Sequence, residues 1–202
     1  MSTLILIDVQ NDFIPGGSLS VPEGDQIIDP INNMLHKFDL VIATQDWHPQ
    51  DHKSFASNHQ GKDIFETIDL QGLEQKLWPD HCVQGTNGAS FHPDLNTAPI
   101  EAIFHKGMDR EIDSYSGFYD NGHRKSTGLT GYLREKEAKE LYFCGLAADI
   151  CVYFSILDAL KLGFSAHLIE DASRPLDKAG FETLKRELEE KGCKILNSDQ
   201  IT

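Results

Sequence analysis

Between residues 140 and 169 the sequence reads ELYFCGLAADICVYFSILDALKLGFSAHLI, which predicts a strand, a helix and a second strand in succession. The apolar run at residues 140–144 has the length of a buried strand, and small residues follow it at 145–148. A helical pattern then covers residues 149–162 and ends before Gly163, a residue suited to a helix C-terminus. The next apolar run, residues 165–169, completes a unit that is typical of a parallel sheet.

The same alternation extends along most of the chain. Other apolar runs occupy residues 3–9, 40–44, 100–104 and 193–196, and further helical patterns cover residues 26–38 and 178–191. We therefore expect a single α/β domain over residues 1–202, with a mainly parallel six-stranded sheet and helices on both faces. Residues 45–99 interrupt the rhythm and carry only a weak helical signal at 70–77, so we expect an inserted loop with a functional role.

Composition narrows the class of protein. A chain of 202 residues with 40% hydrophobic and 25% charged residues is typical of one soluble domain. Its formal net charge of -14, with no basic patch, argues against nucleic acid and anionic membranes as partners. The apolar run at residues 4–7 is too short for a membrane span, so a cytoplasmic enzyme is expected, and a homo-oligomer is compatible with the sequence. Four widely separated cysteines predict reduced thiols, not a disulfide scaffold or a zinc ribbon.

Polar residues stand at the ends of several predicted strands. Asp8, Asp46, Lys106 and Gly145 each follow an apolar run. In open α/β sheets, ligands bind beyond the carboxyl ends of the strands, so this shared rim is the expected active site.

A possible nucleophile lies at the same rim. Cys151 falls in the first turn of the predicted helix, where the helix dipole and free N–H groups favour a thiolate and can stabilise an oxyanion. Asp8 would take the thiol proton, and Lys106 would stabilise the anions. The alternatives are a small buried cysteine, an aspartate that caps a turn and an ordinary surface lysine.

Histidines and a carboxylate around the long loop suggest a metal site. Asp46 and His48, two residues apart on an extended segment, can point to one side, and His81 can complete a three-ligand set. Such ligands suit zinc, iron or manganese, although loop histidines that only make hydrogen bonds are an equal alternative. His52 and Ser54 are close enough in sequence to reach the same ion.

With these residues collected, nearly the whole chain resembles the nicotinamidase branch of the isochorismatase-like hydrolases, which have a Rossmann-like fold. The resemblance rests on six motifs in order: LIDVQNDF at 6–13, QDWHP at 45–49, WPDHCV at 78–83, FHKG at 104–107, DSYSGF at 113–118 and GLAADICV at 145–152.

The resemblance implies a role for each site residue. Asp8, Lys106 and Cys151 would form the catalytic triad, and Asp46, His48 and His81 would bind one divalent metal ion, with zinc expected and iron or manganese as alternatives. Ser54 occupies a further metal-shell position, which leaves open a direct bond, a water-mediated contact or a replacement by His52. A cis peptide before Ala147 would direct the N–H groups of Ala147 and Cys151 into an oxyanion hole. Phe13 and Trp78 would flank a pyridine ring in an aromatic pocket that also includes Tyr115.

The implied reaction is hydrolysis of nicotinamide to nicotinic acid and ammonia through a thioester on Cys151, in NAD salvage, with pyrazinamide as a second substrate. Three rival functions differ in chemistry. They are hydrolysis of another small amide or N-carbamoyl compound, direct attack by a metal-bound water, and non-catalytic binding on a shared fold.

Overall fold

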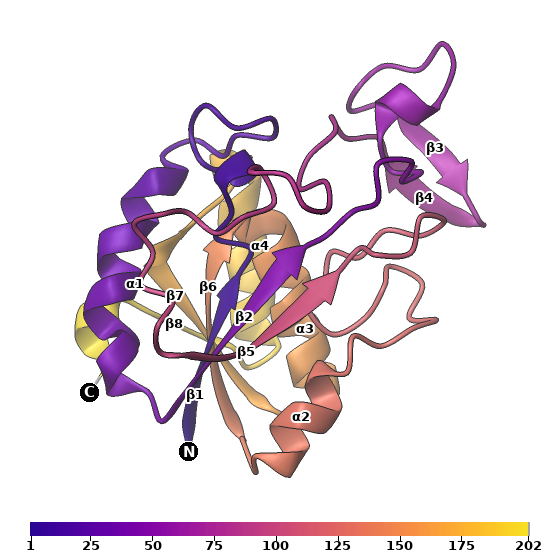
Figure 1. The fold of residues 1–202 in the computed structure, drawn as a ribbon. Coiled ribbons are helices and arrows are strands. Elements are labelled where there is room, and N and C mark those ends of the chain that lie inside the picture. The colour runs from indigo at the N-terminus through magenta and orange to yellow at the C-terminus, as the bar shows by residue number, and fades with distance from the viewer. Residues whose placement is uncertain (202) are drawn as a thin grey trace.

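Six parallel strands form the central sheet of the computed structural model, which describes residues 1–201 (Figure 1). In chain order they are β1 (Ser2–Ile7), β2 (Leu40–Asp46), β5 (Ile100–Lys106), β6 (Glu140–Leu146), β7 (Ser165–Arg174) and β8 (Lys194–Leu196). The order across the sheet is β5-β2-β1-β6-β7-β8, and every neighbouring pair is parallel. The predicted six-stranded parallel sheet is therefore confirmed.

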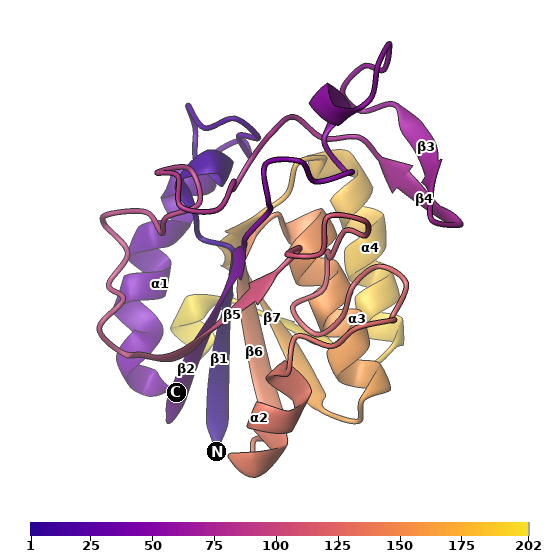
Figure 2. The ribbon, with the colours of Figure 1, turned by 45° about the vertical axis from the view of Figure 1, so that its right-hand side comes forward.

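The sheet is buried on both faces because successive side chains of its strands point to opposite sides. On β1, Leu4 and Leu6 belong to one hydrophobic core, and Ile5 and Ile7 belong to the other. Helix α1 (Ile28–Met34) covers the first face. The second face is covered by three helices, α2 (Leu129–Glu135), α3 (Tyr153–Lys161) and α4 (Lys178–Glu190), and Figure 2 shows the two layers on either side of the sheet.

Two predicted helices differ in detail from those observed. The pattern at residues 26–38 becomes a 3₁₀ turn, the short helix α1 and a second 3₁₀ turn, with Pro30 in the first turn of α1, where its missing N–H is tolerated. The pattern at residues 149–162 begins with a π-helical turn, Ala148–Val152, before α3. Helix α2 was not predicted from the sequence.

The prediction of helical structure at residues 70–77 is wrong. This segment belongs to an antiparallel hairpin of β3 (Thr67–Leu70) and β4 (Leu73–Lys76), which projects from the body of the molecule (Figure 1). Gln71 and Gly72 form its turn, and both have positive φ, as tight hairpin turns require. The spacing of Leu70, Leu73 and Leu77 imitates a helical face, although only Leu70 and Leu77 are buried.

The long segment between β2 and β5 crosses the edge of the sheet where the carboxyl ends of the strands meet. Its ordered contacts include bridges between His48 and Val83 and between Phe55 and Trp78. Over residues 1–201, no helix combines the length and the apolar character needed to cross a membrane.

Candidate active site

Four adjacent strands bring the three predicted catalytic residues together with Asp46, a predicted metal ligand. Asp8 follows β1, Asp46 ends β2, Lys106 ends β5 and Cys151 lies in the π-helical turn after β6. All four side chains are buried, although each has a polar or ionisable group. Asp8 has φ of 50°, a left-handed conformation that aspartate adopts more readily than bulky residues do.

Lys106 is the centre of this group. Its Nζ lies 2.9 Å from Asp8 Oδ2 and 2.7 Å from Asp46 Oδ1, and it donates to the carbonyl of Ser114 at 3.0 Å. The Sγ of Cys151 is 3.5 Å away. Burial opposes the charge of Lys106, but the two carboxylates raise its pKa well above the usual lysine range. The buried ammonium therefore stays charged and stabilises anions, and it does not act as a general acid.

The two carboxyl groups have opposite pKa shifts. Burial raises the pKa of Asp8, and the nearby Asp46 adds to this effect, whereas Lys106 and the Thr44 hydroxyl, which donates to Asp8 at 2.7 Å, oppose it. For Asp46, burial is outweighed by Lys106 and His48, which hold its pKa well below the usual range. Asp8 is therefore the group that can exchange a proton, while Asp46 stays ionised.

The thiol of Cys151 differs from the prediction. Burial, together with the negative charges of Asp8 and Asp46, raises its pKa well above the usual cysteine range, even though Lys106 lowers it. The expectation that the helix start alone favours a thiolate is therefore wrong, because the thiol is buried against two carboxylates. A ligand atom of Asp8 lies within 4.8 Å of the thiol, so a base for its proton is at hand.

The turn before Cys151 contains the expected cis peptide, between Leu146 and Ala147. The carbonyl of Ala147 accepts hydrogen bonds from the N–H groups of Ile150 and Val152. Gly145 permits the approach of this turn to β1, because a Cβ there would lie 2.0 Å from a carbonyl oxygen of Ile7.

The three predicted metal ligands form a compact group. Ligand atoms of Asp46, His48 and His81 lie within 4.8 Å of one another, and all three residues are buried. The Nδ1 atoms of His48 and His81 contact the carbonyls of Gly107 and Pro79 at 2.9 and 2.8 Å. Their Nε2 atoms face Asp46 at 3.4 and 3.6 Å.

This group fits a divalent ion. A carbonyl at Nδ1 places the ring proton there and leaves the Nε2 lone pair for a metal, which is the usual outer-shell arrangement of zinc histidines. The Nε2 of His48 is buried and has no hydrogen-bond partner in the described chain. Two buried carboxylates, Asp8 and Asp46, also face the single ammonium of Lys106, so a cation would improve the charge balance.

Ser54 and His52 are placed against each other. The Ser54 hydroxyl lies 2.7 Å from Nδ1 of His52, and its backbone N–H donates to the same atom at 3.1 Å. Because the backbone N–H makes Nδ1 an acceptor, the Ser54 hydroxyl donates its proton to His52. Burial, with the charge of His48, lowers the pKa of His52 to about 4.

Two residues that the sequence did not single out support these ligands. The side-chain amide of Gln10 donates to the carbonyl of Asp46 and accepts from its N–H, both at 2.8 Å. Gly107 has φ of 66°, and a Cβ there would lie 2.3 Å from Cε1 of His48. Gln10 belongs to the motif around Asp8. Its role in holding the backbone of Asp46 becomes visible only from the hydrogen bonds between the two residues in the structure.

One narrow cavity joins the thiol to the metal candidates. Its lining includes both Cys151 and Ala147 from the turn, both Asp46 and His81 from the metal group, and the three predicted aromatic residues Phe13, Trp78 and Tyr115. The sequence did not predict the remaining lining residues, which are Leu19, Asp113, Ile150 and Leu176.

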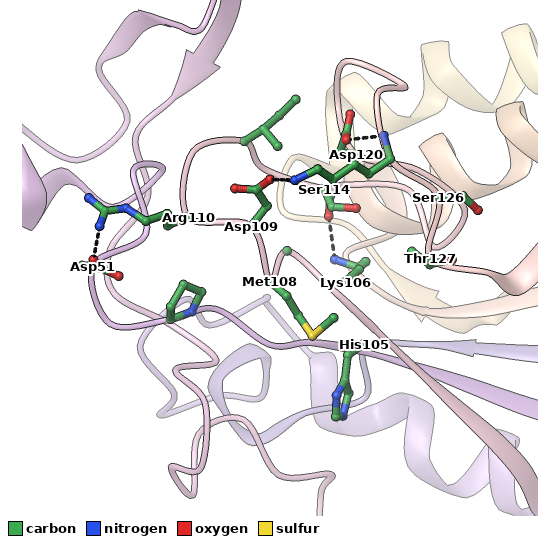
Figure 3. A pocket seen from close by; sticks show the side chains of 14 residues that line it. Asp51, His105, Lys106, Met108, Asp109, Arg110, Ser114, Asp120, Ser126 and Thr127 are labelled. Carbon is green, nitrogen blue, oxygen red and sulfur yellow. Dashed lines mark hydrogen bonds and ion pairs between the residues drawn. The ribbon is translucent and has the colours of Figure 1, made fainter.

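A second cavity, of about 560 Å³, is wider but less suited to the chemistry (Figure 3). Lys106 and Ser114 reach its wall, but the thiol and the metal candidates do not. Its charged residues are already paired, Arg110 with Asp51 and Lys125 with Asp109. We therefore place the active site in the narrow cavity, despite the greater volume of the other.

Comparison with known proteins gives a consistent result. The isochorismatase domain family matches residues 2–200. The nicotinamidase of Escherichia coli is 49% identical over 175 residues, which are 85% of this chain and 82% of that protein.

Solved structures agree with this match. A structure of the nicotinamidase–pyrazinamidase of Acinetobacter baumannii superposes with a TM-score of 0.96 at 46% identity, covering 100% of this chain and 98% of that one. A pyrazinamidase of Pyrococcus horikoshii in complex with zinc has a TM-score of 0.81 at 37% identity, covering 97% and 98%.

Proposed function

The chain belongs to the isochorismatase domain family, and we propose that it is a carboxamide amidohydrolase that converts nicotinamide to nicotinic acid and ammonia. The observation that carries this proposal is the single cavity lined by Cys151, by Asp46 and His81, and by aromatic side chains. A flat heteroaromatic ring with a carboxamide suits such a cavity, because the ring meets the aromatic walls while the amide meets the thiol. The N-carbamoyl alternative is not favoured.

The first half of the reaction uses Cys151 and Asp8. Asp8 takes the thiol proton as sulfur attacks the carboxamide carbon, so a C–S bond forms and the oxygen becomes an oxyanion. Ala147 and Cys151 both line the cavity, and their backbone N–H groups would stabilise the charge of that oxygen. Asp8 then returns the proton to the departing nitrogen, and ammonia leaves as the C–N bond breaks.

The second half hydrolyses the thioester. Asp8, again ionised, takes a proton from a water molecule that attacks the acyl carbon, and the C–S bond breaks to release nicotinic acid. The sulfur recovers its proton, so the enzyme returns to its starting state. Lys106 keeps its charge throughout and stabilises both Asp8 and the transient thiolate.

A metal ion held by the three predicted ligands would bind the substrate ring. Asp46, His48 and His81 would hold one divalent ion, for which we propose zinc, and this ion would supply a Lewis acid for the pyridine nitrogen. Phe13, Trp78 and Tyr115 would hold the faces and edge of the ring. An ammonia-release assay with nicotinamide, pyrazinamide and an N-carbamoyl amine tests the substrate class. Turnover of the first two only is expected, and turnover of the N-carbamoyl amine alone would overturn the proposal.

A further inference from the structure

We propose that His52 is not a ligand of the metal ion but a positioning residue, whose Nε2–H donates a hydrogen bond to the water shell of an ion at Asp46, His48 and His81. The inference rests on the metal site proposed above. It concerns the capacity in which His52 faces that ion.

The contacts of Nδ1 determine which ring nitrogen of His52 carries the proton. The backbone N–H of Ser54 donates to Nδ1 at 3.1 Å, and a backbone N–H can only donate. Nδ1 must therefore accept, and it carries no proton. The neutral ring consequently carries its proton on Nε2, and the Ser54 hydroxyl, 2.7 Å from Nδ1, also donates to it.

This tautomer excludes ligation by His52 through Nε2. A histidine that binds a metal through Nε2 must carry its remaining proton on Nδ1. In His52 a proton on Nδ1 would point at the backbone N–H of Ser54, and two donors that face each other repel. Ligation through Nδ1 is excluded as well, because two groups of Ser54 already occupy that atom.

The remaining group is a buried donor without an acceptor. His52 is fully buried, and its Nε2 has no hydrogen-bond partner in the described chain. Leaving such a donor unpaired in the interior is destabilising. The backbone of Ile112 approaches the ring as a weak hydrogen-bond partner. No hydrogen bond of normal geometry joins it to the His52 Nε2.

His52 nevertheless lies beside the metal candidates. Ligand atoms of His48, His52 and Asp113 lie within 4.8 Å of one another, and the rings of His48 and His52 are 4.4 Å apart. His48 thus belongs both to the proposed ligand group and to this second group. Next to an ion at His48, water molecules would find a donor in His52 and an acceptor in Asp113.

Histidine ring NMR tests the tautomer directly. In ¹⁵N-labelled wild-type protein, long-range ¹H–¹⁵N spectra recorded without and with Zn²⁺ should show His52 as the Nε2–H tautomer in both states. Its Nε2–H signal should shift on Zn²⁺ addition, while His48 and His81 should show metal-bound Nε2. A His52→Gln variant assigns the signal.

Zn²⁺ affinity, measured by competition with a chromophoric chelator, gives a second readout. His52→Phe should weaken binding about 10-fold, a typical outer-shell effect, and His81→Ala should weaken it far more. His52→Gln keeps an N–H donor and should lose less than His52→Phe. His59→Gln is the matched control, because the His59 ring is hydrogen-bonded to the Lys53 carbonyl at 2.7 Å and not to the metal candidates, and this variant should bind Zn²⁺ normally.

Three results would overturn the inference. An Nδ1–H tautomer in the Zn²⁺ form, or a His52→Phe loss equal to that of His81→Ala, would make His52 a ligand. An Nε2–H signal unmoved by Zn²⁺ would mean that the donor points to Ile112 instead. Failure of the wild type to bind Zn²⁺, with His48 and His81 unchanged, would remove the metal site itself, which is a distinguishable outcome.

Discussion

The Nζ of Lys106 lies 2.7 Å from Oδ1 of Asp46, and this contact joins the two halves of the active site. The same carboxylate faces the Nε2 atoms of His48 and His81, while the same ammonium lies 3.5 Å from the Cys151 thiol. A change of charge on either side is therefore transmitted across one buried ion pair.

Removal of the lysine should be costly for this reason. Lys106→Met leaves Asp8 and Asp46 buried without their common cation, so we expect a loss of about 3–5 kcal/mol in the free energy of unfolding, measured with urea. Adding Asp8→Asn removes one unpaired charge, and the double variant should recover part of the loss. Equal stability of the single and double variants would contradict the buried ion-pair account.

The pH profile of kcat/KM should change when the Thr44 hydroxyl is removed. Asp8 must be ionised to accept the thiol proton, so kcat/KM should fall as the pH drops through its raised pKa. The Thr44 hydroxyl stabilises the carboxylate at 2.7 Å and lowers that pKa. Thr44→Val should therefore move the acid limb of the profile to higher pH.

Thr3→Val provides the control for this experiment, because the buried Thr3 hydroxyl has no partner in residues 1–201 and lies at the opposite end of β1 from Asp8. Its acid limb should match that of the wild type. An unmoved limb in Thr44→Val would show that another group limits activity in acid.

A methyl group at Gly107 should disturb the metal site. Gly107→Ala places a Cβ 2.3 Å from His48 Cε1, so His48 must move, and Zn²⁺ affinity should fall by roughly 10–100-fold. Gly163→Ala is the matched control. Gly163 also has positive φ but no atom within 4 Å of the added Cβ, so it should lose about 1–2 kcal/mol of stability and keep its affinity. Equal affinities in the two variants would contradict the placement of His48.

The aromatic wall should affect binding of the ring. Trp78→Leu removes one face of the narrow cavity, so KM for nicotinamide should rise roughly 10-fold while kcat changes less. Phe65→Leu is the comparison, since Phe65 packs against Trp78 in a T-shaped pair but does not line the cavity. A KM effect of the same size in both variants would indicate that Trp78 acts through packing alone.

Much of this site was predictable because it lies where parallel strands end. Asp8, Asp46 and Lys106 each follow a run of apolar residues, and Cys151 lies in the turn after a fourth run. The strand order β5-β2-β1-β6 makes those runs neighbours. Their chemical types were readable from the sequence, and their convergence follows from the topology of the fold.

The sequence could not predict the contacts between segments that lie far apart along the chain. Gln10 donates a hydrogen bond to the carbonyl of Asp46, 36 residues away in the sequence. Gln75 of the hairpin donates one to Asp113, 38 residues away. The raised pKa of Cys151 also depends on burial against Asp8, which no local pattern encodes. The β3–β4 hairpin was missed because leucines at helical spacing masked the Gln71–Gly72 turn.

The covalent role of Cys151 is the central claim, and ammonia release from nicotinamide by Cys151→Ala tests it most directly. The variant should first be shown to bind as much Zn²⁺ as the wild type, so that only the nucleophile differs. We expect kcat to fall by about 10⁴-fold or more, to the buffer background. Sustained turnover by Cys151→Ala would contradict the account and would assign the attack to a metal-bound water instead.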